Sequence, residues 1–172
     1  SLVDVIPLAT TVPSVLALAQ VSYLEGEPET YAVPMAVLSG EEAQRVAADQ
    51  PFSVIANAHW DGGEGVLVEG MIDRGVCAAL FDLARRRRRV QGRSGALSSW
   101  PTSALKAVLA DADGPLEPDL FRAEQSNTSV VYGHRAILKL FRRCAAGLNP
   151  DLEVGLHLNH TRFENAPRVL SS

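Results

Sequence analysis

Lysine is nearly absent from this sequence of 172 residues, which has two lysines, Lys106 and Lys139, beside fourteen arginines. We attribute this bias mainly to a preference for arginine codons, but it singles out each lysine for inspection. Cysteine is as scarce, with Cys77 and Cys144 alone. Two cysteines are too few for a disulfide scaffold and lack metal-binding spacing, which favours free thiols in a reducing compartment.

No lysine or arginine precedes Arg45, so the apolar beginning of the chain lacks the charged region of a signal peptide. Asp4, Pro7 and Pro13 interrupt this stretch, and no apolar run is long enough to cross a bilayer. We therefore expect a cytoplasmic protein without membrane contact. Because the first residue is not Met, we expect the chain ends to be processing or cloning boundaries.

The charge balance is mildly acidic, with 16 basic and 20 acidic residues, a net charge of −4 and a pI near 5.5. Such a chain has no overall attraction to nucleic acids or anionic membranes. The five consecutive arginines at 85–89 are compatible with a phosphate or nucleic-acid patch. We favour a solvated helix end with Gly92 near its C-cap, because five consecutive residues point all round a helix.

Apolar and β-branched runs predict antiparallel hairpins. The first pairs residues 15–23 with 31–38 around an acidic turn, and the second pairs 52–58 with 66–69 around a Gly-rich turn. Pro34 has no N–H to donate to a ladder, which predicts an edge strand or a bulge at that position.

Two helices are predicted between and after these hairpins. Ser39 followed by Glu42 is a capping-box sequence that opens a short helix, which Pro51 closes. Asp73 can cap a longer helix whose apolar side chains share one face. Residues 92–102 are rich in Gly, Ser and Pro and predict a linker. We place a domain boundary near residue 115, which makes 1–115 an antiparallel β-rich domain with helices.

The C-terminal segment, 116–172, has a different order of predicted elements. Its pattern predicts three strands, at 120–124, 130–132 and 136–141. A polar run at 124–129 lies between the first two strands. Asn149, Pro150 and Asp151 then predict a helix N-terminus, with Glu153 in the first turn. The overall class is α+β.

Lys139 is the notable residue of this segment, because it lies in an apolar strand and shares a face with Ile137 and Phe141. Burying an ammonium there is costly unless an anion meets it. In a kinase N-lobe the same order of elements places a loop over the nucleotide phosphates, a lysine on them and a helix glutamate on the lysine. A snorkelling lysine on an edge strand gives much of the same pattern.

Three stretches carry a closer resemblance: EQSNTSVVYG at 124–133, ILKLFRR at 137–143 and NPDLEVG at 149–155. They resemble the bacterial maltokinases, including the maltokinase part of trehalose synthase fusions. A weaker likeness, at 26–31, 65–68 and the arginine run, is to the N-terminal cap domain of that family. The resemblance covers essentially the whole chain.

The resemblance implies an aminoglycoside-kinase-like fold, with a cap domain at 1–115 and the start of a protein-kinase-like N-lobe at 116–172. It implies ATP-dependent transfer of a phosphoryl group to the anomeric hydroxyl of maltose, in trehalose and glycogen metabolism, with Mg²⁺ on the phosphates. The implied phosphate-covering residues are Gln125, Ser126, Asn127, Thr128 and Ser129, with Lys139 on the phosphates and Glu153 paired with Lys139.

The sequence also departs from that family, because it has no His-Gly-Asp catalytic loop with a following Asn and no later metal-binding Asp. It stops at Ser172, where a hinge should follow, so we expect part of a longer enzyme that is inactive alone and holds no catalytic residue. The parent is either a free kinase or a trehalose synthase fusion.

Two other interpretations remain open. The cap can be an interaction module that positions the kinase beside trehalose synthase or a maltosyltransferase. Alternatively, Glu153, His157 and His160 have helical spacing and can share one face as metal ligands, although three exposed side chains explain the same spacing.

Overall fold

The computed structural model describes residues 1–110, 116–121, 127–161 and 163–172. In chain order its elements are β1 (Leu2–Pro7), β2 (Ser14–Val21), β3 (Glu29–Ser39), α1 (Gly40–Asp49), the 3-10 turn η1 (Pro51–Ser53), β4 (Val54–Trp60), β5 (Gly63–Glu69), η2 (Gly70–Ile72), α2 (Arg74–Arg85), β6 (Arg89–Gln91), β7 (Ala96–Ser98), α3 (Ser103–Ala110), β8 (Pro118–Phe121), β9 (Asn127–Tyr132), β10 (Ala136–Phe141), β11 (Arg143–Cys144) and α4 (Pro150–Thr161).

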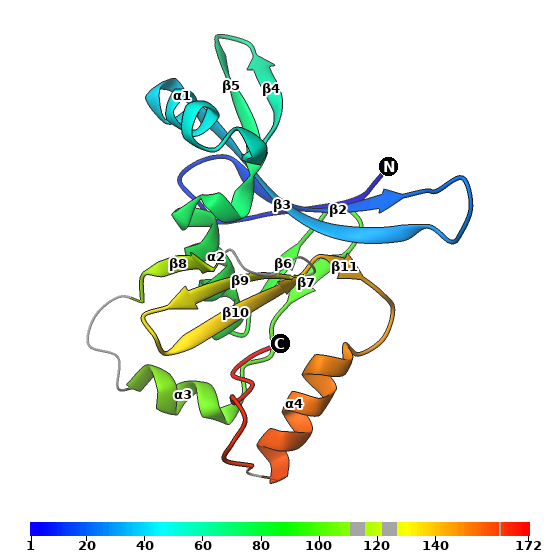
Figure 1. Cartoon of the computed structure of the whole chain (residues 1–172), viewed down its shortest axis with the longest axis vertical. Helices are drawn as coiled ribbons and strands as arrows, with labels where there is room; N and C mark the ends of the chain where they lie inside the picture. Colours follow the sequence, from blue (N-terminus) through cyan, green and yellow to red (C-terminus); the bar gives the residue numbers. More distant parts are fainter. Residues whose placement is uncertain (111–115, 122–126, 162) are drawn as a thin grey trace.

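These strands form three antiparallel sheets. The largest has the order β1-β2-β3-β5-β4, and β11 joins it by pairing with β3. A second sheet has the order β10-β9-β8, and β6 pairs with β7. Figure 1 shows the β2-β3 and β4-β5 hairpins extending in different directions, with α2 between them and the three-stranded sheet. The predicted α+β class with antiparallel sheets is therefore confirmed.

Both predicted hairpins are present. In the first, β2 pairs with β3 from Ser14↔Ala36 to Val21↔Glu29. In the second, β4 pairs with β5, and Gly62 takes a φ of +85° in the turn. This left-handed conformation favours glycine, which explains the Gly-rich turn sequence. An additional strand, β1, pairs with the outer side of β2.

Pro34 lies inside the large sheet, so the predicted edge position is wrong. It sits in β3, pairs with Leu16 of β2 and is almost completely buried. The other side of β3 changes partner at this point: β11 pairs with Thr30 and Tyr31, and β5 begins its pairing at Met35. The position between these two partners requires no N–H donor, so a proline is tolerated in an interior strand.

The predicted starts of α1 and α2 are confirmed, although only the start of α2 has a capping side chain. Asp73 is the N-cap of α2 and accepts a 2.8 Å hydrogen bond from the Val76 N–H. Ser39 is the N-cap residue of α1, but its side chain makes no capping hydrogen bond. The capping-box sequence therefore marks the helix start without forming the box.

The arginine run ends α2, but Gly92 does not cap that helix. Arg86 is the C-cap residue, and Arg87 follows it with a φ of 49°, the left-handed conformation that usually belongs to a glycine at this position. The chain then enters β6 at Arg89. The run is thus divided between a helix end, a turn and a strand.

The predicted linker is an ordered hairpin that closes on Asp4. The Gly92 N–H donates to the Gly95 carbonyl between β6 and β7, and Asp4 is only 5% exposed. Its carboxylate accepts hydrogen bonds from the N–H groups of Val5, Ser94 and Gly95 at 2.8–2.9 Å. A Cβ at Gly92 would lie 2.7 Å from this carboxylate, so the contact requires glycine there.

Residues from both predicted domains share one hydrophobic core. It contains Leu38, Val68 and Val76 from the first segment together with Val130 and Tyr132 from the second. The predicted boundary near residue 115 lies outside the described residues. Residues on both sides of the predicted boundary therefore contribute to this core cluster, and a smaller cluster contains Ile6, Leu16 and Ala32.

The C-terminal residues return to the middle of the chain. The Trp100 N–H donates to the Ser172 carbonyl at 2.7 Å, and the Thr102 N–H donates to the Leu170 carbonyl at 2.8 Å. These bonds attach the last residues to the segment that precedes α3. In the described ranges, no helix has the length and apolar character needed to cross a membrane.

Asp4 makes the fold sensitive to acid. Hydrogen bonds, above all from the Ser94 N–H, hold the pKa of Asp4 below its ordinary value. The ionised carboxylate therefore stabilises the fold above the ordinary carboxyl pKa, and this contribution disappears as the pH falls through the lowered value. We expect Asp4→Asn to reduce the urea midpoint at pH 7, with a difference from the unmodified protein that shrinks toward pH 3.

The control is Asp61→Asn, which changes an exposed carboxylate in the β4-β5 turn and should produce no such difference. Urea titrations followed by circular dichroism at both pH values measure it. A difference between Asp4→Asn and the unmodified protein that is equal at pH 7 and pH 3 contradicts this role of the carboxylate.

Candidate functional site

Lys139 lies on the outer face of the three-stranded sheet. In the β9-β10 register Lys139 stands opposite Ser129, and Ile137 stands opposite Val131. The alternate residues of these strands, including Tyr132 and Ala136, are buried in the shared core. Because side chains alternate along a strand, Lys139 and Ile137 point away from that core.

The shared face predicted for Lys139, Ile137 and Phe141 is therefore correct, but its predicted burial is wrong. Lys139 is exposed and Ile137 is 63% exposed, in a strand at the edge of its sheet. The ammonium reaches solvent, so its location alone does not demand a buried anion. The apolar neighbours of Lys139 suggested burial on both faces of the strand, whereas β10 is an edge strand and only one of its faces packs against the core.

The predicted phosphate-covering loop is largely strand where the structure describes it. Gln125 and Ser126 lie outside the described residues, whereas Asn127, Thr128 and Ser129 form the first half of β9. Ser129 is buried, with 3% exposure. The strand begins three residues earlier than predicted, because its polar residues pair with β10 as regularly as the apolar ones.

The Thr128 hydroxyl belongs to a network with the Arg142–Glu69 ion pair, which the sequence did not indicate. Arg142 donates two hydrogen bonds to the Thr128 hydroxyl, at 2.9 Å from Nε and 2.6 Å from Nη2. The same Nη2 lies 2.8 Å from the Glu69 carboxylate, whose other oxygen accepts from the Met71 N–H at 3.1 Å. Arg142 thus joins β9 to the end of β5.

The next residue, Arg143, makes a second connection to the large sheet. Its guanidinium lies 2.8 Å from the Glu29 carboxylate, and its backbone pairs with Tyr31 in the short β11–β3 ladder. The hydroxyls of Tyr31 and Tyr23 donate to Glu29 and hold the pKa of this carboxyl below its ordinary value. Two consecutive arginines therefore hold the end of β10 on two strands of the large sheet.

Glu153 lies in α4, but no ion pair joins it to Lys139, so the predicted contact of these two described residues is absent. The Asn149 carboxamide caps α4 by accepting from the Asp151 N–H at 2.9 Å, as the sequence predicts. Asn159 near the other end makes two hydrogen bonds with Val169. Figure 1 shows α4 beside the C-terminal segment, to which these bonds attach it.

The alternative metal site on α4 is not formed. Glu153, His157 and His160 are all exposed, and in the described part of the chain no three His, Cys, Asp or Glu residues are grouped closely enough to hold a metal ion. Helical spacing alone placed these residues on one helix without bringing their ligand atoms together.

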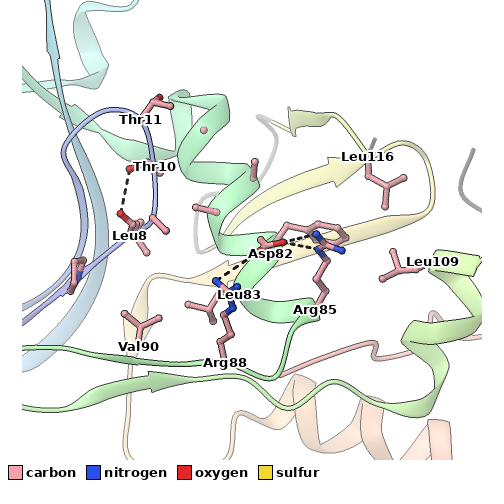
Figure 2. A pocket seen from close by; sticks show the side chains of 16 residues that line it. Leu8, Thr10, Thr11, Asp82, Leu83, Arg85, Arg88, Val90, Leu109 and Leu116 are labelled. Atoms are coloured by element: carbon pink, nitrogen blue, oxygen red, sulfur yellow. Dashed lines mark hydrogen bonds and ion pairs between the residues drawn. The ribbon is translucent and has the colours of Figure 1, made fainter. Parts of the chain in front are cut away.

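The arginine run borders a cleft of about 670 Å³ that the sequence did not predict. We call it the α2 cleft, because it lies between α2 and the loop of residues 8–13. Figure 2 shows Arg85 and Arg88 both reaching Asp82 at this cleft. Its lining residues are Pro7, Leu8, Ala9, Thr10, Thr11, Gly75, Ala78, Ala79, Phe81, Asp82, Leu83, Arg85, Arg88, Val90, Leu109 and Leu116.

Comparison with models of known protein families finds none that matches the chain.

The two consecutive arginines are expected to differ in their contribution to stability. The Arg142–Glu69 pair is mostly buried, with side-chain exposures of 22% and 28%, whereas Arg143 is 68% exposed. A partly buried hydrogen bond between charged groups, such as that of Arg142 and Glu69, contributes about 2 kcal/mol to stability. An exposed ion pair, such as that of Arg143, contributes less than about 1 kcal/mol. We expect Arg142→Met to lower the free energy of unfolding by about 2 kcal/mol, and the matched Arg143→Met by less than half of that.

Urea denaturation of both variants, followed by circular dichroism, measures these differences. Equal losses, or a larger loss for Arg143→Met, would show that the Thr128–Arg142–Glu69 network does not hold the three-stranded sheet in place.

Proposed function

We propose that these 172 residues supply the cap and the ATP-phosphate-binding elements of a maltokinase-like enzyme. The substrates of the whole enzyme are ATP and maltose, and its product is maltose 1-phosphate. The three-stranded sheet is the nucleotide-binding part of the chain, in the position of a kinase N-lobe sheet. Lys139 is the residue that meets the phosphates.

One observation carries this proposal: Lys139 is exposed on the side of the sheet that faces away from the core and forms no ion pair with another described residue, although Ser129 opposite it is buried. Val131 and Ile137 lie beside it on the same face and offer an apolar surface to a nucleobase. A lone lysine next to such a surface suits an anionic, partly apolar ligand, which is the character of ATP.

The chemistry proposed for the whole enzyme is phosphoryl transfer. The anomeric oxygen of maltose forms a bond to the γ-phosphorus as the bond to the ADP oxygen breaks, and the hydroxyl proton passes to a general base. This chain contributes charge and position through Lys139. Mg²⁺ bound to ATP neutralises the phosphates, while the general base and the protein ligands of the metal are not assigned to any residue here.

Glu153 has a conditional part in this proposal. In the kinase arrangement a helix glutamate orients the lysine, whereas no ion pair among the described residues joins Glu153 to Lys139. We propose that their pairing accompanies nucleotide binding and an inward shift of α4, as in kinases that switch between inactive and active forms.

The two lysines of the chain provide a matched test of nucleotide binding. Lys139→Met should weaken the binding of MgATP at least tenfold, because it removes the cation that meets the phosphates. Lys106→Met, which changes an exposed lysine on α3, should leave the affinity unchanged. Isothermal titration calorimetry on the three proteins gives these affinities. Equal affinities in the folded variants would make Lys139 an ordinary edge-strand residue.

The 172 residues alone should not phosphorylate maltose. The sequence has no His-Gly-Asp loop, so it lacks the proposed general base and metal ligands. Purified protein incubated with radiolabelled ATP, Mg²⁺ and maltose should form no labelled maltose 1-phosphate above the level without protein. Turnover that depends on magnesium would mean that the active site lies elsewhere in the chain.

A further inference from the structure

The α2 cleft lies outside the proposed nucleotide face and has its own chemistry. Its volume of about 670 Å³ is within the range of about 300–1,000 Å³ that is typical of small-molecule sites. Gly75, Ala78 and Ala79 form its side along α2. Because these residues have minimal side chains, a ligand can approach the helix closely.

Apolar side chains make up most of the remaining wall. Leu8, Leu83, Val90, Leu109 and Leu116 line the cleft, and all of them are half-buried. None belongs to the exposed large hydrophobic residues of the chain. An apolar ligand therefore has to enter the cleft to contact them, which favours a free molecule over the flat surface of a membrane.

Cations are in excess where Asp82 meets the arginine run. The Asp82 carboxylate lies 2.6 Å from Arg85, 2.7 Å from Arg86 and 3.9 Å from Arg88. One carboxylate thus faces three guanidinium groups, two of which, Arg85 and Arg88, line the cleft. The remaining positive charge complements an anionic group at this side of the cleft.

We propose that the α2 cleft binds a free anionic amphiphile, a carboxylate with an unbranched acyl chain. The chain lies against Ala79 and the apolar wall, where it leaves water. The carboxylate lies at Arg85 and Arg88 and shares them with Asp82. This proposal is independent of the nucleotide site, because the two sites have no residue in common.

The test uses decanoate as the probe, with decanol and butyrate as comparisons that lack the charge or most of the chain. Calorimetry at neutral pH, below micelle-forming concentrations, should show decanoate binding at least tenfold more tightly than either comparison. Arg85→Met/Arg88→Met should weaken decanoate binding at least tenfold and leave decanol binding unchanged. The control Arg45→Met changes an exposed arginine on α1 and should alter neither.

A second pair of variants tests the apolar part of the cleft. Ala79→Trp fills the cleft and should abolish the binding of decanoate, whereas Ala48→Trp, on the exposed side of α1, should not. If circular dichroism shows that Ala79→Trp is unfolded, Ala78→Trp replaces it. Decanoate that does not bind, binds no better than butyrate or decanol, or binds equally to the arginine and tryptophan variants overturns the proposal. Binding only to vesicles of phosphatidylserine also overturns it.

Discussion

Burial of Tyr132 determines where the C-terminal half of the chain lies. The ring is completely buried and stacks on Phe81 with centroids 4.2 Å apart, and the hydroxyl donates a 2.7 Å hydrogen bond to the Cys77 carbonyl. Both partners belong to α2. A buried phenol requires such a partner, and burial raises the pKa of Tyr132, so the hydroxyl stays a donor. This contact places β9 on α2 and turns its other face outward.

Lys139 is exposed because β9 packs on α2 through Tyr132. Once Tyr132 and Val130 occupy the core, the β9-β10 register leaves Lys139 and Ile137 on the opposite side. Arg142 then holds β9 to the end of β5 through Glu69. The same packing explains why residues from both parts of the sequence lie in the larger hydrophobic cluster. In this account the large sheet and α2 support the proposed nucleotide face.

Local patterns in the sequence predicted the elements whose conformation depends on neighbouring residues. The Gly-rich turn of the β4-β5 hairpin, Asp73 at the start of α2 and Asn149 at the start of α4 are of this kind. Contacts between residues far apart in the chain are not marked by any local sequence pattern. Ser94 and Gly95 looked like a linker because their ordering depends on Asp4, about ninety residues earlier in the chain. The exposure of Lys139 likewise depends on which face of its sheet meets α2.

The central claim is that the outer face of β9 and β10 receives the phosphates of ATP. Its most direct test is a titration of the isotope-labelled chain with MgATP, followed by amide chemical shifts in two-dimensional NMR spectra. The account predicts saturable shifts concentrated at Ser129, Val131, Ile137 and Lys139, with the amides of the arginine run unchanged. Shifts centred on Arg85 and Arg88, or no saturable shifts on β9 and β10, would contradict it.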